Sequence, residues 1–196
     1  MNPDASPQPY RVLVVCTGNI CRSPMGEVVL RERLAEAGMA DLVEVASAGT
    51  SDEEHGNPID RRARAVLAEH GYPVPAHSAH QVRPGELARY DLALAMTTQH
   101  ARALRRRAEL DGPGRSAEVR LWREFDASAA GERDLDVPDP WYGDHAGFYD
   151  TLRVVESGAE GLVAHLREAL AMDGEHPRRA GAPGDVRAAP RTPPRR

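Results

Sequence analysis

The chain has 196 residues, with 25 basic and 30 acidic side chains and a formal net charge of −5. A chain of this length buries about two-thirds of its unfolded surface, so it needs no disulfide framework or structural metal. Its two cysteines exclude a disulfide scaffold and a four-cysteine zinc site. The longest apolar runs, such as 12–16 and 92–96, have five residues, whereas a membrane span needs about 20. The mild acidity argues against a general nucleic-acid binder.

The two ends of the chain are expected to be disordered. Residues 1–9 hold three prolines, and residues 173–196 hold five prolines, three glycines and only one large apolar residue. Such segments cannot bury enough apolar surface to offset the entropy lost on ordering. The second segment carries a charge of +3, so the remaining residues carry −8. We therefore expect one folded domain over residues 10–172 between two extensions.

Segments typical of strands and helices alternate along this domain. Apolar and β-branched runs predict strands, and apolar residues at helical spacing, followed by Gly38 or Gly71, predict helices. The expected elements are a strand at 10–15, a helix at 24–37, a strand at 42–48, a helix at 60–70, a strand at 90–96, a helix at 98–110, a strand at 118–122 and a helix at 145–171. The alternation predicts an α/β fold: a single three-layer domain with a four-stranded parallel sheet flanked by helices.

One segment between the first strand and the first helix has the features of a phosphate-binding loop. It reads Cys16-Thr17-Gly18-Asn19-Ile20-Cys21-Arg22-Ser23 and is followed by Pro24. Gly18 and Asn19 tolerate left-handed backbone angles, so the loop can turn successive backbone N–H groups inward around an anion. The N-terminus of the following helix adds its positive dipole end. We expect Ser23 to cap this helix and Arg22 to bind two phosphate oxygens.

Cys16 is expected at the bottom of this cradle. Helix N-termini and neighbouring cations favour the thiolate, so we expect Cys16 to be a nucleophile facing the phosphorus of a phosphate monoester. A cysteine at the end of a strand can also be a small buried apolar residue. Here the strand, the Cys-x5-Arg spacing, the Ser-Pro pair and the helix coincide, which favours the nucleophile. A Walker-type loop is excluded because the chain contains no lysine.

These residues closely resemble the low molecular weight protein tyrosine phosphatases of bacteria. The stretch VCTGNICRSPMGE (15–27) matches that family's signature almost residue for residue, and Asp139-Pro140-Trp141-Tyr142-Gly143 resembles its second signature. SAGT at 47–50, HGYP at 70–73, His77 and Gln81-Val82 extend the resemblance. It covers about residues 10–170 and implies the same fold.

The resemblance implies a phosphatase mechanism and assigns its residues. Cys16 would attack phosphorus and form a phosphocysteine intermediate, and Asp139 would first protonate the leaving oxygen and then activate water. The phosphoryl oxygens would be held by the side chain of Arg22 and by the backbone N–H groups of Thr17, Gly18, Asn19, Ile20, Cys21 and Arg22. The substrates would be phosphotyrosine-containing proteins and small aryl phosphates, with no metal and no cofactor.

Further roles also come from the resemblance. Asn19 would hold the strained loop, Ser23 would donate its hydroxyl to the thiolate, and His77 would brace the network that Asn19 and Ser23 form. Trp141 and Tyr142 would form a wall of the cleft against which a phenyl ring packs. Two hypotheses stay open for Cys21: a reversible disulfide with Cys16 after oxidation, or a packed thiol.

The chain departs from the family pattern in two places. Met96-Thr97-Thr98-Gln99-His100 stands where many relatives have Met-Asp-x-x-Asn, so no catalytic role is assigned to 96–100. The segment 51–56, which often carries an aromatic residue, is acidic here and includes Glu53. With Glu53 at the substrate cleft, we expect a preference for phosphopeptides with basic flanks.

Other interpretations share part of this pattern. Thioredoxin-coupled arsenate reductases relay a disulfide through further cysteines, which this chain lacks. Protein arginine phosphatases carry threonine at the position of Ile20, so isoleucine favours phosphotyrosine. A non-catalytic phosphoprotein-binding module needs neither Cys16 nor Asp139. Since no signal sequence is visible at the start of the chain, we expect a cytoplasmic protein, and we expect a monomer.

Overall fold

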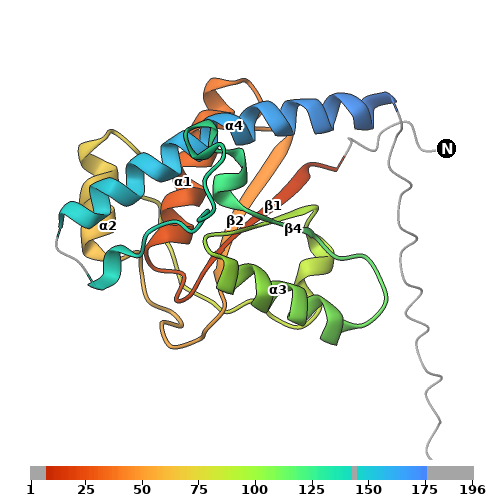
Figure 1. Cartoon of the computed structure of the whole chain (residues 1–196), viewed down its shortest axis with the longest axis horizontal. Helices are drawn as coiled ribbons and strands as arrows, with labels where there is room; N and C mark the ends of the chain where they lie inside the picture. The colour runs from red at the N-terminus through yellow and green to blue at the C-terminus, as the bar shows by residue number, and fades with distance from the viewer. Residues whose placement is uncertain (1–7, 143–144, 176–196) are drawn as a thin grey trace, which may run out of the picture.

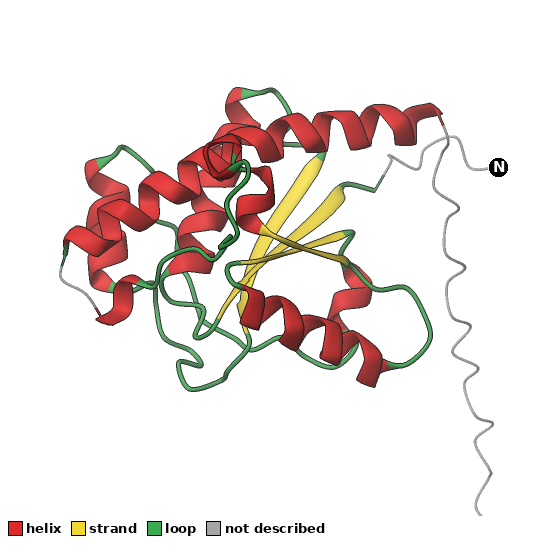
Figure 2. Ribbon diagram, in the orientation of Figure 1, coloured by secondary structure: helices red, strands yellow, loops and turns green. Residues whose placement is uncertain are grey.

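The computed structural model of the chain describes residues 8–142 and 145–175, and it has the expected order of strands and helices (Figures 1 and 2). The strands are β1 (Tyr10–Cys16), β2 (Val43–Gly49), β3 (Leu92–Ala95) and β4 (Glu118–Leu121). The α helices are α1 (Arg22–Glu36), α2 (Arg61–Glu69), α3 (Thr98–Asp111) and α4 (Ala146–Glu175). Short 3₁₀ helices lie at η1 (Glu86–Arg89), η2 (Trp122–Phe125), η3 (Ala127–Ala129) and η4 (Pro140–Tyr142).

The four strands form one parallel sheet in the order β2-β1-β3-β4, which confirms the predicted fold class. β1 lies between β2 and β3. The connection after β1 therefore leads to the strand on one side of it, and the connection after β2 crosses over to the strand on its other side. Ligand sites in open α/β sheets lie at such a point, outside the carboxyl ends of the strands. The loop that follows β1 therefore occupies the place where this fold positions a ligand.

β1 alternates between two hydrophobic cores, which divide the molecule into three layers. Val12 and Val14 pack in the core that α1, α2 and α4 cover, whereas Leu13 and Val15 pack against apolar residues of α3. All four side chains are fully buried. Because successive side chains of a strand point to opposite faces, a buried central strand must be apolar at every position. Figure 1 shows α1, α2 and α4 on one side of the sheet and α3 on the other.

Two helix boundaries differ from the sequence prediction. α1 begins at Arg22 with Cys21 at the N-cap position, so the prediction that Ser23 caps this helix is wrong; its hydroxyl bonds within the site instead. α4 continues to Glu175, so residues 173–175, predicted to be disordered, are helical. A formed helix extends readily because each added residue brings a hydrogen bond. The remaining predicted extensions, 1–7 and 176–196, lie outside the described residues.

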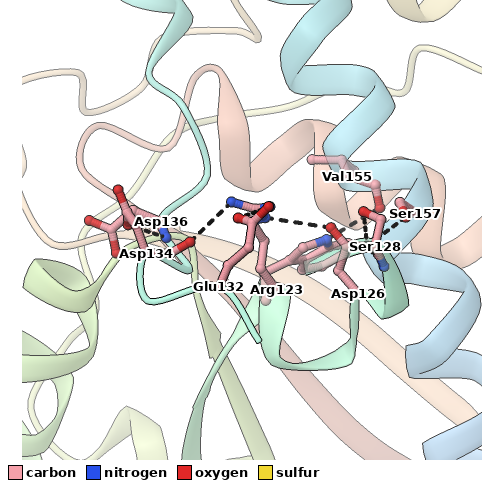
Figure 3. Close-up of polar contacts among 9 residues, drawn as sticks. Arg123, Asp126, Ser128, Glu132, Asp134, Asp136, Val155 and Ser157 are labelled. Atoms are coloured by element: carbon pink, nitrogen blue, oxygen red, sulfur yellow. Dashed lines mark hydrogen bonds and ion pairs between the residues drawn. The ribbon is translucent and has the colours of Figure 1, made fainter. Parts of the chain in front are cut away.

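Polar contacts fix the segment between β4 and α4 (Figure 3). Trp122 donates its indole N–H to the carbonyl oxygen of Val155 in α4 (3.2 Å), and the Asp126 carboxylate accepts the hydroxyl hydrogen of Ser157 (2.6 Å). Arg123 contacts Asp126 and reaches forward to the backbone of residue 134. These contacts hold the chain that leads to the Asp-Pro-Trp-Tyr motif against α4.

Within the described residues, no helix is both long and apolar enough to cross a membrane.

Candidate active site

The loop after β1 folds tightly against the end of β2. Asn19 has a φ of 57°, the left-handed conformation expected for this position. The backbone N–H groups of Thr50 and Ser51 donate to the carbonyl oxygens of Cys16 (2.9 Å) and Thr17 (3.0 Å). A Cβ at Gly49 would lie 2.5 Å from the Thr17 carbonyl oxygen, so this close approach requires glycine.

The side chain of Asn19 holds this loop from below. Its amide N–H₂ donates to the hydroxyls of Ser23 (3.0 Å) and Ser47 (2.9 Å), and its Oδ1 accepts the backbone N–H of His80 (3.1 Å). The side chain is fully buried, and the backbone donor at His80 fixes which amide atom is the oxygen. The structure therefore brings Asn19 and Ser23 together as the resemblance implied.

Cys16 lies at the base of the loop, 3% exposed, at the carboxyl end of β1. Its Sγ is 3.0 Å from Ser23 Oγ. Ser23 accepts a hydrogen bond from Asn19, and its one hydroxyl hydrogen has two acceptors in reach, the Cys16 sulfur and the Ala48 carbonyl oxygen at 3.3 Å. A hydroxyl that donates to sulfur stabilises the anionic, nucleophilic form.

The side chain of His77 contacts the backbone of the loop. The Nε2 atom of His77 lies 2.7 Å from the carbonyl oxygen of Asn19. The contact is thus to the main chain of the residue in the strained conformation and not to the side-chain network of Asn19 and Ser23. It ties the loop to the 77–80 segment, which already binds the Asn19 side chain.

Arg22 and Asp139 meet directly, although 117 positions separate them in the sequence. Arg22 Nη2 donates to Asp139 Oδ2 at 2.6 Å, and Nη1 donates to the carbonyl oxygen of Val137 at 3.4 Å. The Arg22 side chain is 7% exposed and the Asp139 side chain 36%. Val137 in turn donates its N–H to the Met96 carbonyl oxygen after β3 (2.8 Å). The segment 137–139 is therefore anchored beside the loop that follows Cys16.

Trp141 lies at the rim of the site. Its side chain is 42% exposed, and its backbone N–H donates to Asp139 Oδ1 (3.1 Å). The Arg62 guanidinium carbon lies 5.4 Å from the centre of a Trp141 ring and 4.6 Å from that of Phe148. This cation–π stacking fixes Trp141 against α2. Tyr142 ends η4, and its side chain lies outside the described residues.

Cys21 has a different environment from Cys16. Burial raises the pKa of the Cys21 thiol above its usual range, and the nearby carboxylate of Asp60 raises it further. Cys21 therefore remains a thiol near neutral pH, and its backbone lies at the N-cap of α1.

Of the acidic residues in segment 51–56, Glu54 lies against the loop. A Cβ at Gly18 would meet the Glu54 Cγ at 2.9 Å, and the Glu54 carboxylate accepts a hydrogen bond from Asn57 (2.7 Å). Glu53, which the sequence placed at the cleft, is exposed. Three consecutive acidic residues, Asp52, Glu53 and Glu54, give no pattern in the sequence that shows which of them faces Gly18.

Sequence reasoning missed His100. The residue is 4% exposed and contacts the hydroxyls of Thr17 and Thr97 through its two ring nitrogens. Burial lowers the pKa of His100 to about 4, with the Arg22 charge acting in the same direction. The only available signal was a histidine in place of the family's usual asparagine, four positions after Met96.

No group of three or more histidine, cysteine or acidic side chains within 8–142 and 145–175 is arranged to hold a metal ion.

Comparison with known proteins identifies the family. Residues 11–172 match the family model described as low molecular weight phosphotyrosine protein phosphatase. A low molecular weight protein-tyrosine-phosphatase of Streptomyces coelicolor is 49% identical over 159 residues, which cover 81% of this chain and 94% of that protein.

Solved structures agree with this match. YfkJ from Bacillus subtilis superposes with a TM-score of 0.74 at 27% identity, covering 84% of this chain and 99% of that one. The YwlE arginine phosphatase from Geobacillus stearothermophilus superposes with a TM-score of 0.67 at 28% identity, covering 88% and 100%. The chain belongs to the low molecular weight phosphotyrosine protein phosphatase family.

Proposed function

We propose that this protein is a protein-tyrosine phosphatase that hydrolyses phosphotyrosine in proteins, and small aryl phosphates, through a phosphocysteine intermediate. The observation that carries the proposal is the meeting of three groups from distant parts of the sequence. Cys16 lies under the N-terminus of α1, Arg22 lies in its first turn, and Asp139 is 2.6 Å from the Arg22 guanidinium. A thiol, an anion-binding fork and a carboxyl acid are the groups that this reaction needs.

In the first step, the Cys16 sulfur attacks phosphorus and the bond from phosphorus to the phenolic oxygen breaks. The N–H groups of the loop and the Arg22 fork stabilise the three oxygens that stay on phosphorus. The phosphoryl group competes with Asp139 for Arg22, because both are anions that fit a guanidinium. A carboxyl released from Arg22 is free to donate its proton to the leaving oxygen.

In the second step, water attacks phosphorus and the sulfur–phosphorus bond breaks. Asp139 takes a proton from the water, so the acid of the first step becomes the base of the second. The Cys16 sulfur leaves as a thiolate, which the Ser23 hydroxyl stabilises at 3.0 Å. Inorganic phosphate and the starting protein are the products.

The test is the rate of hydrolysis of p-nitrophenyl phosphate against pH for the native protein and three variants. Cys16→Ser should abolish turnover, and Asp139→Asn should lower kcat by on the order of 10²–10⁴ and remove one limb of a bell-shaped profile. Ser23→Ala, which leaves sulfur and acid in place, is the control and should retain partial activity. Turnover by Cys16→Ser would refute the proposal.

One structural likeness favours a second candidate, since the arginine phosphatase from Geobacillus stearothermophilus shares this fold. The buried Ile20 in the loop supports phosphotyrosine, because the arginine phosphatases carry threonine there. Matched peptides carrying phosphotyrosine or phosphoarginine discriminate between the two. A higher kcat/KM on the phosphoarginine peptide would assign the protein to the second class, and Ile20→Thr should shift the ratio toward phosphoarginine.

The cytoplasm is the location that we propose, since a thiol nucleophile must stay reduced and cytoplasmic thiols do. A monomer is the state that we propose, and light scattering after gel filtration tests it.

A further inference from the structure

His100 lies between two hydroxyl groups that belong to different elements. It sits in the first turn of α3, and its Nδ1 is 2.9 Å from the Oγ1 of Thr97, the residue that caps this helix. Its Nε2 is 2.9 Å from the Oγ1 of Thr17 in the phosphate loop. The ring is 4% exposed, so these two hydroxyls are its polar partners within the described residues.

The cap determines which ring nitrogen carries the hydrogen. Thr97 Oγ1 accepts the backbone N–H of His100 (3.3 Å), and its other polar contact within the described residues is Nδ1. If Nδ1 donated to Thr97, the hydroxyl hydrogen of Thr97 would have no acceptor there, so the hydroxyl donates to Nδ1. A neutral imidazole has one acceptor and one donor nitrogen, so Nε2 carries the hydrogen and donates to Thr17 Oγ1. In this arrangement the Thr97 hydroxyl and both ring nitrogens of His100 have partners, and the hydrogen of the Thr17 hydroxyl stays unused among the described residues.

The Thr17 hydroxyl then keeps its own hydrogen for another acceptor. Thr17 follows Cys16 directly, and its backbone carbonyl is fixed by Ser51. Thr17 is exposed, so its hydroxyl hydrogen is open to an acceptor that enters from solvent, and hydrogen bonds to a charged acceptor are the strong ones. In the opposite tautomer Nε2 would be an acceptor, and the Thr17 hydroxyl would donate its hydrogen to Nε2 instead.

We propose that His100 is a positioning residue that turns the Thr17 hydroxyl hydrogen toward the phosphate group held by the loop. The inference rests on the proposed function, because it concerns the same phosphate site. It gives a role to a histidine that stands where many relatives have asparagine, in a stretch to which the sequence assigned none.

The experiment measures how well inorganic phosphate protects Cys16 from alkylation by iodoacetate, a readout that needs no turnover. His100→Met removes the ring donor, Thr17→Val removes the hydroxyl, and His100→Gln and Thr17→Ser are the matched controls that keep a donor and a hydroxyl. We expect His100→Met and Thr17→Val each to raise the protecting phosphate concentration about tenfold. The controls should change it little, and the double variant should be no worse than either single variant.

A purely structural role predicts a different result. It predicts a lower melting temperature with unchanged protection, and it predicts no rescue by His100→Gln. Unchanged protection in Thr17→Val would overturn the inference, as would independent effects in the double variant. The melting temperature of each variant shows whether it is folded. If the native protein fails to hydrolyse aryl phosphates while the protection data agree, the proposed function fails and the role of His100 stands.

Discussion

The two cysteines of the phosphate loop lie five residues apart and differ in chemistry. Cys16 has a hydroxyl partner at 3.0 Å and lies at the base of the loop. Cys21 is buried, and both burial and the Asp60 carboxylate raise the pKa of its thiol. Since the thiolate is the reactive form of cysteine, we expect Cys21 to be the less reactive of the two sulfurs.

We predict that iodoacetamide at neutral pH modifies Cys16 and leaves Cys21 intact in the folded protein. The alkylation rate at Cys21 should be at least about tenfold lower, because burial disfavours its thiolate. Peptide mass spectrometry after timed quenching gives both rates. Cys16→Ser protein is the control, and rapid labelling of Cys21 in it would contradict the prediction.

The same difference bears on oxidation by peroxide. The Cys21 thiol would have to attack an oxidised Cys16 sulfur to form a disulfide and release water, and its raised pKa makes that attack slow. The rate of this step therefore distinguishes the two hypotheses for Cys21, because a reversible disulfide requires this attack and a packed thiol does not.

At the scale of elements, α4 carries glycines where the 122–125 segment crosses it. A Cβ at Gly158 would overlap the buried ring of Trp122, and a Cβ at Gly161 would overlap the carbonyl oxygen of Phe125. Glycine weakens a helix interior by about 0.5–1 kcal/mol relative to alanine. Glycine is nevertheless needed at position 161, because the backbone carbonyl of Phe125 cannot move aside as a flexible side chain can.

Gly161→Ala should therefore destabilise the protein by about 1–3 kcal/mol, the usual cost of overpacking. Gly147→Ala is the matched control on the same helix, since its Cβ would lie at ordinary contact distance, 3.7 Å from Pro140. Chemical denaturation gives both values. Equal stability of the two variants would show that η2 can shift away from α4.

At the scale of the whole molecule, buried titratable groups make the fold sensitive to acid. Burial acts to raise the pKa of Asp126, but hydrogen bonds from Ser128 and Ser157 outweigh it and hold the pKa below its usual range. Burial lowers the pKa of His100 to about 4, from an ordinary value of 6.5. In both cases the unfolded chain binds the proton at a higher pH than the folded protein does. Stability therefore falls as the pH falls.

We predict that the free energy of unfolding decreases between pH 6.5 and 4, with His100 contributing about 3 kcal/mol of that loss. His100→Gln should flatten this part of the profile, whereas replacement of the exposed His55 by glutamine should leave it unchanged. Urea denaturation at stepped pH measures the slope. Parallel profiles for native and His100→Gln protein would refute the assignment.

The negative charge of segment 51–56, beside the phosphate loop, predicts a substrate preference. The chain is net acidic, and the acidic segment 51–56 lies beside the loop through the contact of Glu54 with Gly18. Phosphotyrosine peptides with basic flanks should have a higher kcat/KM than acidic ones, and salt should reduce the difference because it screens exposed charges. Glu53→Gln and Glu54→Gln, assayed separately, show which carboxylate acts. Equal turnover of both peptides at low salt would refute the preference.

The sequence by itself determined the sheet and the phosphate loop after β1, with Cys16 at the base of that loop. These features are local: apolar runs predict strands, and Gly18 and Asn19 permit the turn that the spacing from Cys16 to Arg22 requires. The boundaries of α1 and α4 differ from the prediction, because capping depends on which partner a side chain finds. Ser23, a good N-cap by type, bonds to Cys16 and Asn19 instead.

Only the tertiary structure decided which distant side chains meet. His100 reaches Thr17 because the order β2-β1-β3-β4 brings the segments after β1 and β3 to the same edge of the sheet. Asp139, which lies beyond β4, reaches Arg22 because the N–H of Val137 bonds to the Met96 carbonyl oxygen directly after β3. Whether Glu53 or Glu54 faces the loop depends on the rotation of a turn. Hydrophobic pattern and turn chemistry act over a few residues, whereas these contacts depend on strand order and on the phase of each helix and loop, which the packed core fixes.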